Sequence, residues 1–180
     1  MTRRFLSGSL LAILSTAAFA MPPLPRRSPE FTITEGPGKD VLLSNYRGKV
    51  VVLAFVHTTC IHCQAFSSMV NGIQKDLGPR GFQAIDVAWN TNADQLAPAF
   101  AKQLGLTFPV GYGTWDPIMS FLGFSVMDRP VVPLIVVIDK KGMIRAQSPP
   151  EGDANLQDGV KLRALVESLL NEGATTRAKR

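Results

Sequence analysis

The chain has 180 residues, and its 19 lysines and arginines against 14 aspartates and glutamates give a formal net charge of +5. This length suits one domain with a full core. The basic excess is modest and scattered, which disfavours nucleic-acid binding, because nucleic acid requires a concentrated basic stripe. With only two cysteines, the chain is not a small secreted domain stabilised by several disulfides.

Residues 1–20 have the features of a signal peptide. Arg3 and Arg4 precede an apolar run over residues 10–18, and small residues form an A-x-A cleavage site ending at Ala20. The apolar stretch is shorter than the roughly 20 residues that a membrane span needs, so we predict cleavage rather than a retained anchor. The export route, general secretory or twin-arginine, stays open. Export would place the protein in the periplasm or another oxidising compartment.

The next segments predict a parallel strand–helix–strand unit. Residues 21–29 form a proline-rich lead-in that we expect to be extended. Residues 49–56 (KVVVLAFV) are almost all β-branched or apolar, which is typical of a central strand buried on both faces. Apolar residues at helical spacing predict a helix that follows Cys60 and stops at residues 78–81, and residues 82–89 predict a second strand. A right-handed crossover should connect the two strands.

Three helices and a hairpin are predicted for the second half of the chain. A short helix should begin near Pro98, where proline fits the first turn, and end at Gly105. Residues 116–123 predict one or two further helical turns. Residues 133–146 (PLIVVIDKKGMIRA) predict a β-hairpin with a tight turn, and residues 162–170 predict a last amphipathic helix.

These elements predict an α/β fold, with a central mixed β-sheet flanked by helices and a C-terminal β-hairpin and helix. Asp86, Trp89 and Trp115 are most simply interpreted as edge, core or loop residues. The expected divisions are a cleaved leader (1–20), a lead-in (21–29), one domain (30–172) and a flexible basic tail (173–180).

Both cysteines and both histidines lie in the stretch HTTCIHCQ, residues 57–64. Cys60 falls where the predicted helix begins, so free N–H groups and the positive end of the helix dipole should stabilise its thiolate. Cys63, one turn later, could form a disulfide with Cys60 and resolve a mixed disulfide formed on it. His62 could tune the Cys60 thiolate through a hydrogen bond or its charge. The spacing predicts an attacking Cys60 and a resolving Cys63.

Two other functions use the same residues. A copper or zinc site would take the ligands His57, Cys60, His62 and Cys63. Against it, both histidines of the chain lie inside the motif, and His57 is otherwise expected to end the buried strand. A thiol peroxidase would need a threonine and an arginine to polarise peroxide, for which Thr58 and Arg129 are the candidates, but the P-x-x-x-T-x-x-C pattern is absent.

The order of strand, TTCIHC and helix, followed by VVPLIVVIDKKGMI, resembles the thioredoxin-like superfamily. Within it, the chain is most similar to the exported TlpA/ResA-type thiol-disulfide oxidoreductases, often called redoxin domains, over residues 30–171. The resemblance implies a thioredoxin fold, an attacking Cys60, a resolving Cys63 and no cofactor beyond their redox-active disulfide. It also implies that Pro133 is a cis-proline beside this disulfide and that Val132 offers its backbone to a bound substrate chain.

The resemblance further implies a monomer that exchanges disulfides with protein thiols and has a membrane thiol-redox partner. The chain also departs from the family pattern. Thr59 stands where the family usually has tryptophan, and Ile61 where proline or glycine is common. Ala54 occupies the place of thioredoxin's buried carboxylate, and Asn90 falls near where some relatives hold a buried glutamate. These departures leave the redox direction open.

Overall fold

The structure is a computed structural model that describes residues 21–172, so the predicted leader and basic tail lie outside the described residues. One eight-stranded sheet runs through it in the order β1-β8-β7-β4-β5-β6-β2-β3. The strands are β1 (Arg26–Arg27), β2 (Thr32–Thr34), β3 (Asp40–Leu42), β4 (Val50–Val56), β5 (Phe82–Ala88), β6 (Val110–Tyr112), β7 (Leu134–Ile138) and β8 (Met143–Gln147). This arrangement confirms the predicted α/β fold with a mixed sheet.

Strand β4 is the centre of the sheet, and all seven of its residues are buried. It pairs in parallel with β5 and antiparallel with β7. Its β-branched and apolar residues can face both layers of the core, because helices and loops cover both faces of the sheet. The predicted buried strand, its parallel partner and the hairpin of β7 and β8 are confirmed.

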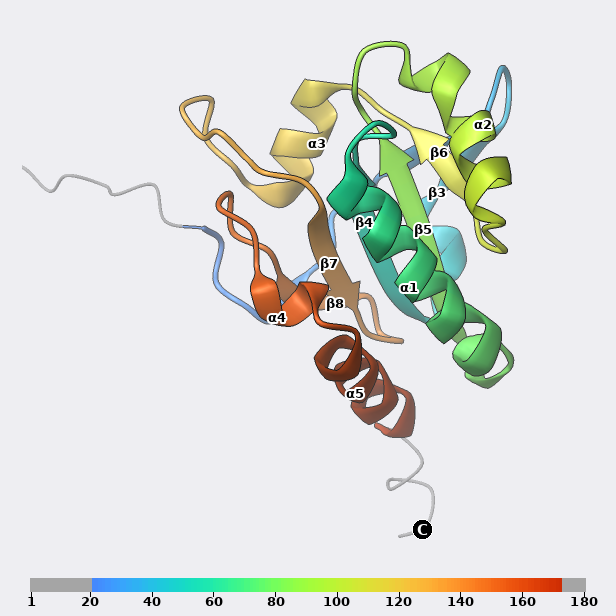
Figure 1. The fold of residues 1–180 in the computed structure, drawn as a ribbon. Coiled ribbons are helices and arrows are strands. Elements are labelled where there is room, and N and C mark those ends of the chain that lie inside the picture. Colours follow the sequence, from blue (N-terminus) through green and yellow to red (C-terminus); the bar gives the residue numbers. More distant parts are fainter. Residues whose placement is uncertain (1–20, 173–180) are drawn as a thin grey trace, which may run out of the picture.

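The helices are α1 (Ile61–Leu77), α2 (Ala93–Leu104), α3 (Trp115–Leu122), α4 (Ala154–Gln157) and α5 (Gly159–Asn171), with short 3-10 turns η1 (Leu43–Tyr46) and η2 (Gly78–Arg80). The apolar faces of α1, α2 and α5 pack together against one face of the sheet, and α1 lies across β4 and β5 (Figure 1). Helix α3 packs against the other face, together with the chain around β2. Among residues 21–172, no helix combines the length and apolarity needed to cross a membrane.

Helix α2 corrects the predicted helix near Pro98. It begins at Ala93, so Pro98 lies inside the helix rather than in its first turn. A proline there has no N–H to donate to the carbonyl of Asp94. Asp94 is exposed in the first turn of α2, so water can satisfy its carbonyl, and the helix continues through the proline to Leu104.

The sheet also contains short strands that the sequence pattern did not predict. Strand β1 comes from the proline-rich lead-in and pairs with β8, with Arg26 opposite Ile144. Strands β2, β3 and β6 have only three residues each. Runs this short show no periodicity, and their positions are set by pairing with strands far along the chain.

Candidate active site at the start of helix α1

Cys60 lies in the tight connection between β4 and α1. It is the N-cap residue of α1, with extended backbone angles, and its side chain is partly exposed. Its N–H donates to the carbonyl of His57 at 3.1 Å, and its own carbonyl accepts from the N–H of Gln64 at 3.0 Å. The sulfur therefore sits at the positive end of a 17-residue helix. The predicted position of Cys60 at a helix start is confirmed.

Cys63 is the buried partner of Cys60. Its side chain is 0% exposed and belongs to the core between α1 and the sheet. Both cysteines are free thiols, and their side chains are within hydrogen-bonding reach of each other. Burial raises the pKa of Cys63, and the hydrogen bond with Cys60 adds to this effect. One sulfur of the pair can thus be reached from solvent, and the other only from inside the protein.

Asn90, just after β5, holds the loop that carries Cys60. Its side-chain oxygen accepts from the Thr58 N–H at 2.8 Å and from the Thr58 hydroxyl at 3.2 Å. From the other side, the Gln64 side chain donates to the Thr58 carbonyl at 2.9 Å. Thr58 itself is buried. These bonds fix the loop from the segment after β5 and from α1, which no local pattern in the sequence indicated.

An aromatic cluster flanks the same loop. The His57 ring lies edge-on to Trp89, with centroids 4.4 Å apart, and Trp89 lies 5.2 Å from Trp115. Burial lowers the pKa of His57. Its backbone carbonyl bonds to Cys60, whereas its ring nitrogen Nε2 is buried without a partner among the described residues. His57 thus contacts Cys60 through its backbone carbonyl, and its ring packs against Trp89, which in turn packs against Trp115.

Pro133 comes from the strand next to β4. The Val132–Pro133 peptide bond is cis, as the resemblance implied. Phe55 of β4 pairs with Leu134 of β7. Pro133, one residue before Leu134, therefore lies beside the carboxyl end of β4, where the Cys60 loop begins. Val132 is partly buried and packs against the same core cluster as Cys60. The chain segment leading into β7 therefore adjoins the cysteine pair.

The other sequence-predicted groups do not gather around the sulfurs. His62 is exposed on the first turn of α1. Within residues 21–172, no three histidine, cysteine or acidic side chains are placed to hold a metal ion. The Thr58 hydroxyl donates to Asn90, and Arg129 donates to carbonyls of its own loop. Both side chains therefore have hydrogen-bond partners outside the cysteine pair.

Asp86 influences the site, although its sequence pattern predicted only an edge, core or loop residue. It lies in the middle of β5, directly opposite Ala54 of β4, and is 1% exposed. The Ser67 hydroxyl of α1 donates to its carboxyl oxygen at 2.6 Å. Burial raises the pKa of Asp86 to about 7, and the Ser67 hydrogen bond opposes this effect. The sequence could have indicated a special role for Asp86. It is an acidic residue inside the apolar run FQAIDVAW, and a buried acidic residue is costly unless it has a partner or a function.

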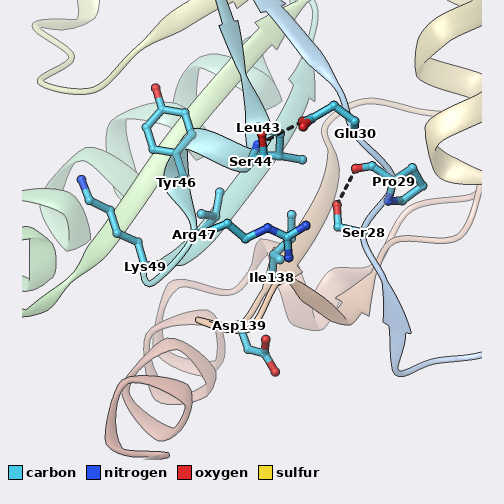
Figure 2. A pocket seen from close by; sticks show the side chains of 12 residues that line it. Ser28, Pro29, Glu30, Leu43, Ser44, Tyr46, Arg47, Lys49, Ile138 and Asp139 are labelled. Carbon is cyan, nitrogen blue, oxygen red and sulfur yellow. Dashed lines mark hydrogen bonds between the residues drawn. The ribbon is translucent and has the colours of Figure 1, made fainter.

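A hollow lies at the amino end of β4, away from the cysteine pair (Figure 2). The Arg47 guanidinium extends over the turn between β7 and β8 and donates to the Lys141 carbonyl at 2.9 Å. The Glu30 carboxylate accepts from the N–H of Ser44 at 3.0 Å. Asp139 at its rim accepts from the N–H groups of the same turn. These three side chains thus bond to backbone groups of the neighbouring turns.

Solved structures with the same architecture define the fold as thioredoxin-like. A thiol:disulfide interchange protein of the thioredoxin family from Chlorobium tepidum TLS superposes with a TM-score of 0.66 at 23% identity, over 83% of this chain and 99% of that one. The thioredoxin domain of a thiol-disulfide oxidoreductase from Bacteroides vulgatus gives 0.65 at 18% identity, over 82% and 97%. At these identities the likeness establishes the fold.

The sequence also places the protein in a family. The AhpC/TSA family model matches residues 25–147, and the chain belongs to that family. Among named relatives, the thiol-disulfide oxidoreductase ResA of Geobacillus thermodenitrificans is 28% identical over 119 residues. The match covers 66% of this chain and 64% of that relative, so the chain spans less than two thirds of the relative's length.

Proposed function

We propose that this protein is a thiol-disulfide oxidoreductase that exchanges disulfides with protein thiols through Cys60 and Cys63. The observation that carries the proposal is the pair itself, in which a partly exposed sulfur at a helix N-terminus contacts a fully buried one. In such a pair the two sulfurs have different roles, because the exposed one can attack the client disulfide and the buried one can resolve the mixed disulfide. The similarity to a relative named as a thiol-disulfide oxidoreductase supports the same chemistry.

In the reducing direction, the Cys60 thiolate attacks one sulfur of a client disulfide. A mixed disulfide forms, and the other client sulfur leaves as a thiolate that takes up a proton. Cys63 then loses its proton and attacks the Cys60 sulfur. The Cys60–Cys63 disulfide forms, and the second client sulfur leaves as a thiol. The client gains two electrons and the cysteine pair loses two; the oxidising direction reverses every step.

Apolar side chains around the entrance suit a polypeptide client. Ile61, next to Cys60, is 73% exposed, and Val131, two residues before Pro133, is 51% exposed. An extended client chain could lie between them and use the Val132 backbone, as the resemblance implies. We further propose that the protein works as a monomer in the periplasm after loss of the leader, with a membrane thiol-redox partner. The leader's composition and the oxidising destination it implies support this location.

Insulin reduction by the full chain after leader removal tests the proposal. Cys60→Ser should reduce turnover to the background rate, because the attacking sulfur is lost. Cys63→Ser should instead accumulate a mixed disulfide between Cys60 and the client, visible as a covalent adduct on non-reducing gels. Ser68→Ala, an exposed change on the same helix, is the matched control and should retain activity. Full turnover by Cys60→Ser would refute the assignment.

The equilibrium reduction potential of the pair decides the direction. A value near roughly −270 mV, as in thioredoxin, means a reductant, and a value near roughly −120 mV, as in DsbA, means an oxidant. His62→Ala tests the tuning role of His62. If the histidine stabilises the reduced form, its removal should make the potential more negative; an unchanged potential would leave His62 as an ordinary exposed residue.

A further inference from the structure

The resolving step requires a proton acceptor that the cysteine pair does not supply. Cys63 must become a thiolate to attack, yet it is fully enclosed, and burial raises the pKa of its thiol. Solvent cannot reach the sulfur to remove the proton. A base inside the core, on the side of Cys63 that faces the sheet, would meet this need.

Asp86 occupies that position. Cys63 and Ser67 are four residues apart on α1, so they lie on the same face of the helix, roughly 5–6 Å apart at their Cβ atoms. The Ser67 hydroxyl donates to the Asp86 carboxyl at 2.6 Å, which places the carboxyl beneath this face. The charge of Asp86 also acts on Cys63, and contributes to the raised pKa of the thiol.

The strand register explains how a carboxyl comes to lie there. Asp86 pairs with Ala54, and the small Ala54 side chain leaves space on the face that α1 covers. The resemblance predicted that the buried carboxyl would be missing, because Ala54 stands in its place. The structure shows a buried carboxyl on the adjacent strand instead, at the same level of the sheet.

We propose that Asp86 is the internal base that takes the proton from Cys63 when Cys63 attacks the mixed disulfide on Cys60. This inference rests on the proposed function. The S–H bond of Cys63 breaks, its proton passes to the Asp86 carboxylate, and its electron pair forms the new bond to the Cys60 sulfur. The client sulfur leaves with the electrons of the old bond. Asp86 then returns the proton to the departing thiolate, so the client leaves as a thiol.

The surroundings of Asp86 make this role chemically reasonable. Burial raises the pKa of Asp86 to about 7, so both protonation states are accessible near neutral pH, which suits a general base. Within residues 21–172, no lysine, arginine or histidine is bonded to it. Asp86 pairs with Ala54 of β4 and with Val110 of β6, and its carboxyl accepts from the Ser67 hydroxyl of α1. Cys63 of α1 is a titratable group on which the charge of Asp86 acts.

Reaction of the reduced, full chain with dithionitrobenzoate separates the two chemical steps. Attack by Cys60 releases one thionitrobenzoate and leaves the other on Cys60 as a mixed disulfide; attack by Cys63 then releases the second. Stopped-flow absorbance follows both releases. Asp86→Asn should slow the second release by about 10²-fold near neutral pH, the range typical of general-base catalysis. The first release should change less than about twofold.

A carboxyl swap distinguishes proton transfer from a structural role. In the double variant Asp86→Ala with Ala54→Asp, the carboxyl returns across the pair of strands at constant side-chain volume, and the second release should recover most of its rate. Asp94→Asn, exposed on α2, is the control and should match the wild type.

The outcomes separate the two proposals. A second release in Asp86→Asn that equals the wild type across pH overturns the role of Asp86. If Asp86→Asn slows both releases, the swap decides, because failure to recover the second release also overturns this role. Absence of the first release in the wild type overturns the proposed function itself.

Discussion

The two ends of strand β4 place their polar groups in opposite situations. At the amino end, Glu30, Arg47 and Asp139 bond to backbone groups of neighbouring turns. At the carboxyl end, a thiol and a carboxyl are enclosed in the core with few partners, and both have raised pKa values because burial disfavours their charged forms. The polar groups of the amino end hold the turns together. The thiol and the carboxyl near the carboxyl end can gain or lose protons, as disulfide exchange requires.

Replacing the carboxyl at the reactive end should stabilise the protein at high pH. The folded pKa of Asp86, about 7, lies above the ordinary value of 3.8. The folded state therefore keeps a proton that the unfolded state releases, so stability falls as pH rises from about 4 to about 7. Asp86→Asn removes this penalty and should raise the free energy of unfolding at pH 8 by up to about 4 kcal/mol, because a difference of one between the folded and unfolded pKa values corresponds to about 1.36 kcal/mol.

Urea unfolding of the reduced proteins at pH 4 and pH 8 measures this effect. The difference between Asp86→Asn and wild type should be large at pH 8 and small at pH 4, and Asp94→Asn should follow the wild type at both. Equal differences at the two pH values would show that the carboxyl is already ionised or already neutral throughout the range.

Replacing the Asp139 carboxyl at the amino end of β4 should act in the opposite direction. Burial opposes ionisation of Asp139, but hydrogen bonds from the Met143 and Lys141 N–H groups and from Arg145 outweigh it and lower the pKa of this carboxyl. Its stabilising contribution is present above pH 4 and lost as pH falls through the folded pKa. Asp139→Ala should lower the free energy of unfolding at pH 7 by about 2 kcal/mol.

Denaturant melts at pH 7 and pH 3 provide the check on Asp139. The cost of Asp139→Ala should shrink from pH 7 to pH 3, because acid approaches the lowered pKa of the wild-type carboxyl, while the exposed control Asp76→Ala should cost less at both pH values. A cost that grows toward acid would contradict the assigned sign.

The smallest effect is expected at the loop clamp. Asn90→Ala removes the acceptor of the Thr58 N–H and hydroxyl, which should cost about 1 kcal/mol. Hydrogen exchange of the Thr58 amide should become faster, whereas Asn45→Ala, an exposed change, should leave it unaltered. Unchanged protection of Thr58 would mean that Gln64 alone holds the loop.

The sequence predicted the central part of the fold because its elements have strong, local patterns. The apolar run of β4, the helical spacing after Cys60 and the β7–β8 hairpin need no distant information. Helix α2 was placed too late, because Pro98 fits a first turn better than a helix interior. The three-residue strands depend on partners far along the chain.

The candidate site was predictable in its sulfurs and less so in its surroundings. Cys60 and Cys63 follow from their spacing and from the strand that precedes them. Asp86 acquires its proposed role from a cross-strand pairing with Ala54 and a contact with Ser67. Asn90 likewise acts on a loop more than thirty residues before it. Such contacts depend on how α1 lies on the sheet, which a single sequence does not express.

The pairing of β1 with β8 has a consequence for the order of assembly. Arg26, near the start of the described chain, lies opposite Ile144 of β8, more than a hundred residues later. A polypeptide that emerges amino end first must release the chain as far as β8 before strand β1 finds its neighbour. The outer edge of the sheet can therefore close only late, and contacts this distant in sequence slow folding. Until then, the exposed border of the β7–β8 hairpin remains open to pairing with other chains.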